Sequence, residues 1–197
     1  MRDTSEIREF FDGMAPRWDA ISKETHDQLA GLLETLPLKE GMSILDVGCG
    51  TGIISGLLQE MTDGNVQGID LSPNMIQIAR AKHHANPHIR FDVGDFSRYQ
   101  ADEPADMVIL FNAYPHFLDL EGLKKSLLRN LKTGGYFVIL HSISRARLSS
   151  CHSGREVHVI SRDLGDPSEE ASFYAPEFDC LRAEESDSHY LVTLIRK

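Results

Sequence analysis

The segment Ser43-Ile-Leu-Asp-Val-Gly-Cys-Gly-Thr-Gly-Ile53 constrains the fold of this chain more than any other. It begins with a short apolar run that ends in Asp46, and it continues into a turn with glycine at every second position. Apolar residues follow at helical spacing, at positions 53, 54, 57, 58 and 61. Glycines let the backbone turn sharply and approach a ligand closely. The pattern therefore predicts a strand, a turn and a helix that open a nucleotide-type cofactor site.

The spacing of the glycines bears on which cofactor the turn holds. A dinucleotide-binding turn usually reads G-x-G-x-x-G, and its third glycine allows the helix to pack closely on the strand. Here the glycines are Gly48, Gly50 and Gly52, and Ile53 stands where that third glycine would fall. The carboxylate of Asp46 suits a ligand with an ammonium group better than a pyrophosphate. The turn therefore favours a cofactor that carries an ammonium group.

Two downstream segments carry acids at the spacing that a nucleoside requires. Residues 65–70 are predicted to form a second strand, which ends in Asp70 about twenty residues beyond the turn, where such folds bind ribose hydroxyls. A carboxylate accepts hydrogen bonds from both hydroxyls at once, and Leu71 is placed to pack on the adenine. Residues 88–93 are predicted to form a third strand, which leads into Gly94-Asp95-Phe96.

With these motifs the chain resembles the class I S-adenosylmethionine-dependent methyltransferases, most closely between residues 43 and 140. The resemblance implies that Asp46 and the glycine turn, with Cys49, surround the amino-acid part of S-adenosylmethionine. It also implies that the Asp95 carboxylate accepts a hydrogen bond from the adenine amine and that Phe96 covers the base.

The N-terminal phrase Phe11-Asp-Gly-Met-Ala-Pro-Arg-Trp-Asp19 resembles the opening of the type-11 methyltransferases, a group that includes quinone-biosynthesis enzymes. This resemblance implies that residues 1–24 fold as a cap over the cofactor, with Trp18 in contact with it. Docking of the aromatic side chains to cover apolar surface, without any role as a lid, is an equal alternative.

Length and composition predict one domain over residues 1–197. The chain has 30 acidic and 20 basic residues, and a net charge of −10 argues against a broad nucleic-acid-binding face. Three widely spaced cysteines argue against a disulfide framework and favour the reducing cytoplasm. We expect no signal peptide at residues 1–7 and no membrane insertion, because no apolar run has the required length.

Alternation of the predicted elements indicates the fold class. Further helices and strands are expected at residues 4–14, 26–37 and 120–131 (helices) and at 105–111 and 136–140 (strands). Thr133-Gly134-Gly135 is expected to separate the last helix from the strand that follows it, and residues 141–175 to be helical in part. Residues 177–197 read as two antiparallel strands. The expected fold is a single doubly wound, Rossmann-like α/β domain, with a mostly parallel sheet and a C-terminal antiparallel hairpin.

Loops after the fourth and fifth strands are expected to face a methyl acceptor, because ligands of open α/β sheets bind beyond the carboxyl ends of the strands. Methyl transfer from a sulfonium requires alignment and a dry pocket, and a base only where the nucleophile arrives protonated. His116 and His141 are the candidate bases, and Tyr114 is a candidate for orienting the acceptor. Asn112 is expected near the methionine part of the cofactor. Packing or hydrogen bonding alone is the alternative role for these residues.

Histidines and arginines gather near the same loops. Imidazole and thiolate ligands suit zinc, but the spacing matches no closed zinc motif, so we expect no metal at the low-probability cluster of His141, Cys151, His152 and His158. The segment 82–88 is interpreted as a surface turn. Arg145, Arg147 and Arg155 indicate either a grip on an acidic substrate or, more simply, a solvated helix face.

Together these patterns favour a cytoplasmic enzyme that transfers a methyl group from S-adenosylmethionine to a small-molecule acceptor. Two alternatives stay open. The first is a noncatalytic S-adenosylmethionine-binding sensor or partner subunit. The second is a nicotinamide-dependent oxidoreductase, against which Ile53 and the Asp95-Phe96 pair both count. The sequence indicates neither the acceptor nor the oligomeric state.

Overall fold

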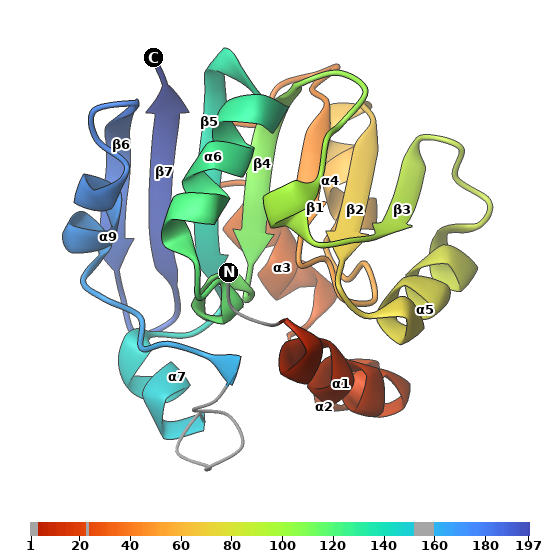
Figure 1. The fold of residues 1–197 in the computed structure, drawn as a ribbon. Coiled ribbons are helices and arrows are strands. Elements are labelled where there is room, and N and C mark those ends of the chain that lie inside the picture. Colours follow the sequence, from red (N-terminus) through yellow and green to blue (C-terminus); the bar gives the residue numbers. More distant parts are fainter. Residues whose placement is uncertain (1–3, 23, 152–159) are drawn as a thin grey trace.

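A seven-stranded sheet forms the centre of the computed structural model, which describes residues 4–22, 24–151 and 160–197. The strand order is β3-β2-β1-β4-β5-β7-β6 (Figure 1). The strands are β1 (Ile44–Val47), β2 (Val66–Asp70), β3 (Ile89–Val93), β4 (Ala105–Phe111), β5 (Leu131–His141), β6 (Phe178–Glu185) and β7 (Tyr190–Arg196). Strands β1 to β5 pair in parallel, whereas β7 is antiparallel to both β5 and β6. The predicted doubly wound sheet with an antiparallel hairpin is confirmed.

Helices cover both faces of this sheet. The α-helices are α1 (Ser5–Met14), α2 (Trp18–Ile21), α3 (His26–Leu33), α4 (Ser55–Thr62), α5 (Pro73–His83), α6 (Leu120–Asn130), α7 (Arg145–Cys151) and α9 (Pro167–Phe173). The 3-10 helices are η1 (Ala15–Arg17), η2 (Phe96–Arg98) and η3 (Tyr114–His116). In Figure 1, α6 and α9 lie in front of the sheet, with α3 and α4 behind it. Among the described residues, no helix combines the length and apolarity that crossing a lipid bilayer requires.

Each face of the sheet packs into its own apolar core. Leu33, Leu58 and Ile76 of α3, α4 and α5 belong to one core, and Leu127 of α6 and Tyr174 after α9 belong to the other. Strand β4 lies between β1 and β5 and contributes to both cores, which explains its continuous apolar sequence. Burial of each large apolar side chain contributes about 1.5–3 kcal/mol, so these cores hold the strand ends in place.

The junction between α6 and β5 differs from the prediction. Helix α6 ends at Asn130, and β5 already begins at Leu131, which pairs with Ala105 of β4. The Asn130 amide closes the helix, since its Nδ2 donates to the carbonyl oxygens of Tyr99 and Ser126 at 3.0 and 2.9 Å. Thr133-Gly134-Gly135 therefore lies within β5, at a shift in the β4–β5 register.

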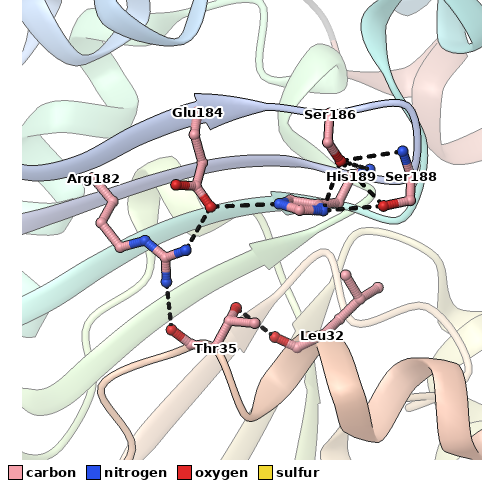
Figure 2. A network of polar contacts seen from close by, with 7 residues as sticks. All are labelled: Leu32, Thr35, Arg182, Glu184, Ser186, Ser188 and His189. Carbon is pink, nitrogen blue, oxygen red and sulfur yellow. Dashed lines mark hydrogen bonds and ion pairs between the residues drawn. The ribbon is translucent and has the colours of Figure 1, made fainter.

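Polar contacts fix the tip of the β6–β7 hairpin and join it to α3 (Figure 2). The Nη1 group of Arg182 donates to the carbonyl oxygen of Thr35 at 2.7 Å, and Nη2 donates to Glu184 Oε1 at 2.5 Å. The ring of His189 lies between Glu184, at 3.5 Å, and Ser186, at 2.9 Å. A cation beside the last carbonyls of a helix is favourable, so this network docks the hairpin on the turn after α3.

Candidate functional site

A cavity of about 530 Å³ lies at the carboxyl ends of the parallel strands. Its walls come from the ends of β1, β2 and β4, from the N-terminal segment, and from α7 and the loop before it. Figure 1 shows α1, α2 and α7 beyond this end of the sheet. The volume is in the range of roughly 300–1,000 Å³ that small-molecule sites occupy.

The glycine turn forms one wall of the cavity. Gly48, Gly50 and Gly52 have φ angles of +72°, +54° and +74°, which explains why glycine recurs at every second position. A Cβ atom on Gly48 would lie 2.6 Å from the Cβ of Ala113, so a larger residue would also displace the loop after β4. Gly48, Cys49 and Gly50 line the cavity. Gly52, which was also predicted to surround the cofactor, is not among the lining residues and lies close to the ring of Phe91.

Asp70, the last residue of β2, supports the glycine turn. Its Oδ2 accepts a hydrogen bond from the Gly50 N–H at 2.9 Å, and its Oδ1 accepts from the Ser72 N–H at 2.8 Å. Burial raises the pKa of the Asp70 carboxyl, and these two backbone donors oppose that effect. Each oxygen retains a second lone pair, and Asp70 lines the cavity together with Leu71. The arrangement suits two further donors on one ligand.

Asp46, near the end of β1, is a buried carboxyl with unused hydrogen-bonding capacity. Its Oδ2 accepts from Ser55 Oγ at 2.6 Å, whereas its Oδ1 is buried with no hydrogen-bond partner among the described residues. Burial, together with the charge of the neighbouring Asp70, raises the pKa of Asp46 to about 7, against the opposing effect of the hydrogen bond from the Ser55 hydroxyl. Because a buried carboxylate requires a donor or a cation, this residue fits a ligand with an ammonium group.

Asp95 and Phe96 reach the same cavity from the turn after β3. Asp95 caps η2, with its Oδ1 accepting from the Ser97 N–H at 2.9 Å, and Phe96 is buried. The structure thus brings together acids from the ends of β1, β2 and the turn after β3. Their carboxylates can accept hydrogen bonds from an ammonium group, from ribose hydroxyls and from an adenine amine.

Loop 112–117 forms the opposite wall. Asn112 has a φ of +53° and exchanges hydrogen bonds with Ser142: its Oδ1 accepts from the Ser142 N–H at 2.9 Å, and its Nδ2 donates to Ser142 Oγ at 3.0 Å. His116 also lines the cavity, and its Nδ1 lies 3.0 Å from the carbonyl oxygen of Ile160. A carbonyl only accepts, so Nδ1 carries the proton in this contact.

Tyr114 and His141 are not among the residues that line the cavity, and their predicted roles there require correction. Tyr114 is fully buried, and its hydroxyl donates to Glu170 Oε2 at 2.8 Å and lies 3.1 Å from the Tyr174 hydroxyl. His141 is fully buried at the end of β5, where its ring packs edge-on to Tyr190 at 5.9 Å. Both belong to the core on the α6–α9 face.

Comparison with known proteins identifies the domain. A family model described as "Methyltransferase domain" matches residues 44–135, which run from β1 into β5 and include the glycine turn, Asp46, Asp70 and Asp95. Residues 44–135 are therefore a methyltransferase domain, and the match supports the resemblance to the class I S-adenosylmethionine-dependent methyltransferases. The match disfavours the nicotinamide-dependent oxidoreductase.

Two curated proteins and one solved structure illustrate the relationship. A sterol 24-C-methyltransferase of Aspergillus fumigatus is 38% identical over 128 residues, covering 62% of this chain and 32% of that protein. A malonyl-[acyl-carrier protein] O-methyltransferase of Acetivibrio thermocellus is 32% identical over 138 residues, covering 68% of this chain and 48% of that protein. The chain thus spans only about a third to about a half of the length of these relatives. In the solved complex between the Haloferax volcanii Trm112 methyltransferase activator and a methyltransferase, one chain superposes with a TM-score of 0.77 at 21% identity, with 96% and 97% of the two chains covered.

The N-terminal segment lies against the cavity through aromatic residues. Phe11 and Trp18 line the cavity and pack edge-on to each other, with ring centroids 5.5 Å apart. Trp18 Nε1 lies 3.5 Å from the position that a Cβ on Gly50 would occupy. Asp12 fixes the segment to the start of α5, since its Oδ1 accepts from Ser72 Oγ at 2.5 Å and from the Asn74 N–H at 3.2 Å.

Asp19 makes a second attachment that the sequence did not reveal. Its Oδ1 accepts from Thr51 Oγ1 at 2.5 Å within the glycine turn, and its Oδ2 accepts from Lys82 Nζ at 3.0 Å. The interpretation of segment 82–88 as a surface turn is therefore wrong at its first two residues. Lys82 holds Asp19, and the Nε2 of His83, at the end of α5, lies 2.9 Å from the carbonyl oxygen of Gly52.

Substitution of Lys82 by glutamine is expected to weaken binding of S-adenosylhomocysteine about two- to fivefold, because an exposed ion pair contributes about 0.2–1 kcal/mol. The change releases Asp19 from α5 without removing any group that lines the cavity. Calorimetric titration measures the effect, and Lys125→Gln on the exposed surface of α6 is the matched control. A lower melting temperature with unchanged affinity would show that the attachment serves stability alone.

Most of the cluster considered for a metal lies outside the described residues. His152, His158 and the side chain of Cys151 lie outside the described residues, as does Arg155. Within the part of the chain that the structure describes, no group of three or more metal-binding side chains gathers. Arg145 is held by Glu185 Oε2 at 2.6 Å and by Asp166 at 3.6 Å.

Proposed function

We propose that this protein transfers a methyl group from S-adenosylmethionine to a small-molecule acceptor. The observation that carries the proposal is the composition of one continuous cavity. Its first half carries the acids and glycines of β1, β2 and the turn after β3. Its second half is built from the loop after β4, the segment 143–148 and the N-terminal residues. The first half is suited to the cofactor and the second to the acceptor.

Each cofactor residue has a role that follows from its chemistry. Asp70 accepts hydrogen bonds from the ribose hydroxyls, and Asp46 lies opposite the ammonium group. Asp95 accepts from the adenine amine, while Phe96 and Leu71 enclose the base. Trp18, above the glycine turn, closes the cofactor half, and residues 1–24 serve as a cap.

When bound, S-adenosylmethionine supplies a methyl carbon on a sulfonium that leaves as a neutral thioether when an acceptor lone pair bonds to that carbon. The protein contributes alignment and exclusion of water. His116, which lines the cavity, is the residue we assign to take the proton of an acceptor that arrives protonated, and the contact of its Nδ1 with the carbonyl oxygen of Ile160 orients the ring. Of the two predicted bases, His116 and His141, only His116 is among the residues that line the cavity.

Binding of S-adenosylhomocysteine is expected to weaken as the pH falls through about 7, because the pKa of Asp46 is raised to about 7 in the ligand-free protein. Below that value Asp46 is protonated and cannot pair with an ammonium group. The affinity is expected to be about tenfold lower at about pH 6 than at about pH 8. Calorimetry at both pH values measures it.

Asp46→Asn is the control for this pH dependence. Asparagine is neutral at every pH, so the variant is expected to bind more weakly at about pH 8 and to show a flat profile down to about pH 6. An equally steep profile in the variant would assign the titration to another group.

The proposal includes a reducing, cytoplasmic location, supported by the free cysteines Cys49 and Cys180 among the described residues. Nothing in the proposed role requires nucleic acid or a membrane.

The alternative of a noncatalytic binding subunit differs from the enzyme in one measurable respect, which is turnover. The protein, loaded with S-adenosylmethionine and supplied with a panel of small-molecule acceptors, is expected to form S-adenosylhomocysteine with an acceptor-dependent rate. Tight cofactor binding without turnover on any acceptor class would favour the sensor or partner subunit.

A further inference from the structure

The acceptor half of the cavity is predominantly apolar. Its walls include Phe117 and Leu118 of the loop after β4, and Ile143 and Leu148 beside and within α7. Ile21, at the end of α2, also lines it and is 47% exposed, one of the few large apolar side chains that the described structure leaves in the open. Such surface favours a ligand that covers it, at roughly 25 cal/mol per Å² of apolar area.

One basic group faces this apolar wall. Among the described residues, Arg147 is the only lysine or arginine that lines the cavity. No ion pair between described residues involves it, whereas Arg145, two positions earlier on the same helix, is held outside the cavity by Glu185 and Asp166. Two of the three arginines that the sequence analysis grouped together therefore differ: Arg145 is held by ion pairs within the protein, and Arg147 is placed for a ligand.

The acids on this side of the cavity already have hydrogen-bond donors within the protein. Glu24 Oε1 accepts from Ser142 Oγ at 2.5 Å, where the N-terminal segment meets the loop after β5. Asp119 caps α6 by accepting from the Gly122 N–H at 2.9 Å. An ammonium group on the acceptor would compete with these donors, whereas an acidic group would gain the guanidinium of Arg147 through two parallel hydrogen bonds.

We propose that the methyl acceptor is an apolar small molecule with one acidic group, which Arg147 binds at the α7 side of the cavity. The role of this molecule as methyl acceptor rests on the proposed function, whereas its binding at Arg147 does not. Residues of the N-terminal segment, the loop after β4 and α7 together enclose the apolar part of the molecule.

The test is calorimetric titration of the protein saturated with S-adenosylhomocysteine, which prevents turnover. The probes are octanoate, octan-1-ol and octylamine, with decanoate as the longer homologue. Octanoate is expected to bind at least about tenfold more tightly than octylamine, and decanoate about tenfold more tightly than octanoate, from about 0.8 kcal/mol per buried methylene.

Variants identify the group responsible. Arg147→Gln is expected to weaken octanoate about tenfold and to leave octan-1-ol unchanged, while Arg147→Lys retains most of the preference. Arg90→Gln, on the exposed surface of β3 and outside the cavity, removes the same charge and is expected to change neither the octanoate nor the octan-1-ol affinity.

A preference for octylamine, or an octanoate affinity that Arg147→Gln does not alter, would overturn this inference. Saturable binding of S-adenosylhomocysteine without any probe binding would overturn it while leaving the cofactor assignment intact, and a folded protein that does not bind S-adenosylhomocysteine would overturn the proposed function itself.

Discussion

Replacement of Asp70 by alanine is expected to weaken binding of S-adenosylhomocysteine at least about 100-fold. Two hydrogen bonds to a charged acceptor contribute about 1.5–3 kcal/mol each, and about 2.7 kcal/mol already corresponds to a factor of 100. The same change leaves the Gly50 and Ser72 N–H groups without their acceptor, so the glycine turn also loses its support. Calorimetric titration of the variant measures the affinity.

Stability is expected to change far less than affinity in this variant. Loss of the two backbone hydrogen bonds costs stability, but removal of a carboxylate whose burial is unfavourable offsets part of the loss. Thermal unfolding without ligand checks this, and Asp102→Ala in an exposed loop is the control for the loss of one charge. A folded Asp70→Ala protein with unchanged affinity would remove Asp70 from the cofactor site.

Replacement of Glu170 by glutamine is expected to lower the free energy of unfolding by about 3 kcal/mol, the lower end of the cost of breaking a buried ion pair. The two oxygens of Glu170 accept from Arg162 Nη1 and Nη2 at 2.7 and 2.9 Å, and also from the Tyr114 hydroxyl and the Gly165 N–H. Glutamine keeps the shape and removes the charge, so the guanidinium of Arg162 stays in place over the Tyr114 ring without its partner. Chemical denaturation measures the loss.

The pH dependence of this loss has a definite sign. Burial alone would raise the pKa of Glu170, but Arg162, the Gly165 N–H and the Tyr114 hydroxyl together hold it below its ordinary value. Stability from a lowered carboxyl pKa is present above the unfolded-state value and is lost as the pH falls through the folded-state value. The difference from wild type is therefore expected to be full at about pH 7 and to shrink in acid. Glu169→Gln, one residue earlier and exposed, is the control, and an equal loss in both variants would contradict the assignment.

This buried network also bears on the acceptor side of the cavity. The backbone N–H of Arg162 donates to the carbonyl oxygen of Pro115 at 2.9 Å, and His116 Nδ1 lies against the carbonyl of Ile160. Segment 160–162 thus holds the loop that presents His116, and the ion pair with Glu170 holds the segment. Tyr114 was predicted to orient the acceptor. Instead, its buried hydroxyl donates to Glu170, and this contact supports the loop from the core side.

Sequence patterns predicted the features that depend on local order. The strand–glycine turn–helix unit and the acids at positions 46, 70 and 95 all arise from residues close in the chain, and the structure has each of them. Periodicity of apolar residues then fixed the faces that pack.

Features that depend on side-chain direction or on contacts between distant residues could not be predicted from the sequence. His141 and Ser142 are adjacent, yet Ser142 bonds to Asn112 beside the cavity while His141 packs on Tyr190 in the core. Neighbouring residues at a strand end point to opposite sides, so an error of one position exchanges a core residue for a site residue. The ion pair between Asp19 and Lys82 joins residues that are 63 positions apart in the sequence, so no local sequence pattern indicates it.

Calorimetric titration of the purified protein with S-adenosylmethionine and S-adenosylhomocysteine tests the central claim most directly, because every assigned role depends on this cofactor. We predict saturable binding of one molecule of either compound in the cavity, weakened at least about 100-fold in Asp70→Ala and unchanged in Asp102→Ala. A folded protein that binds neither compound would contradict the account.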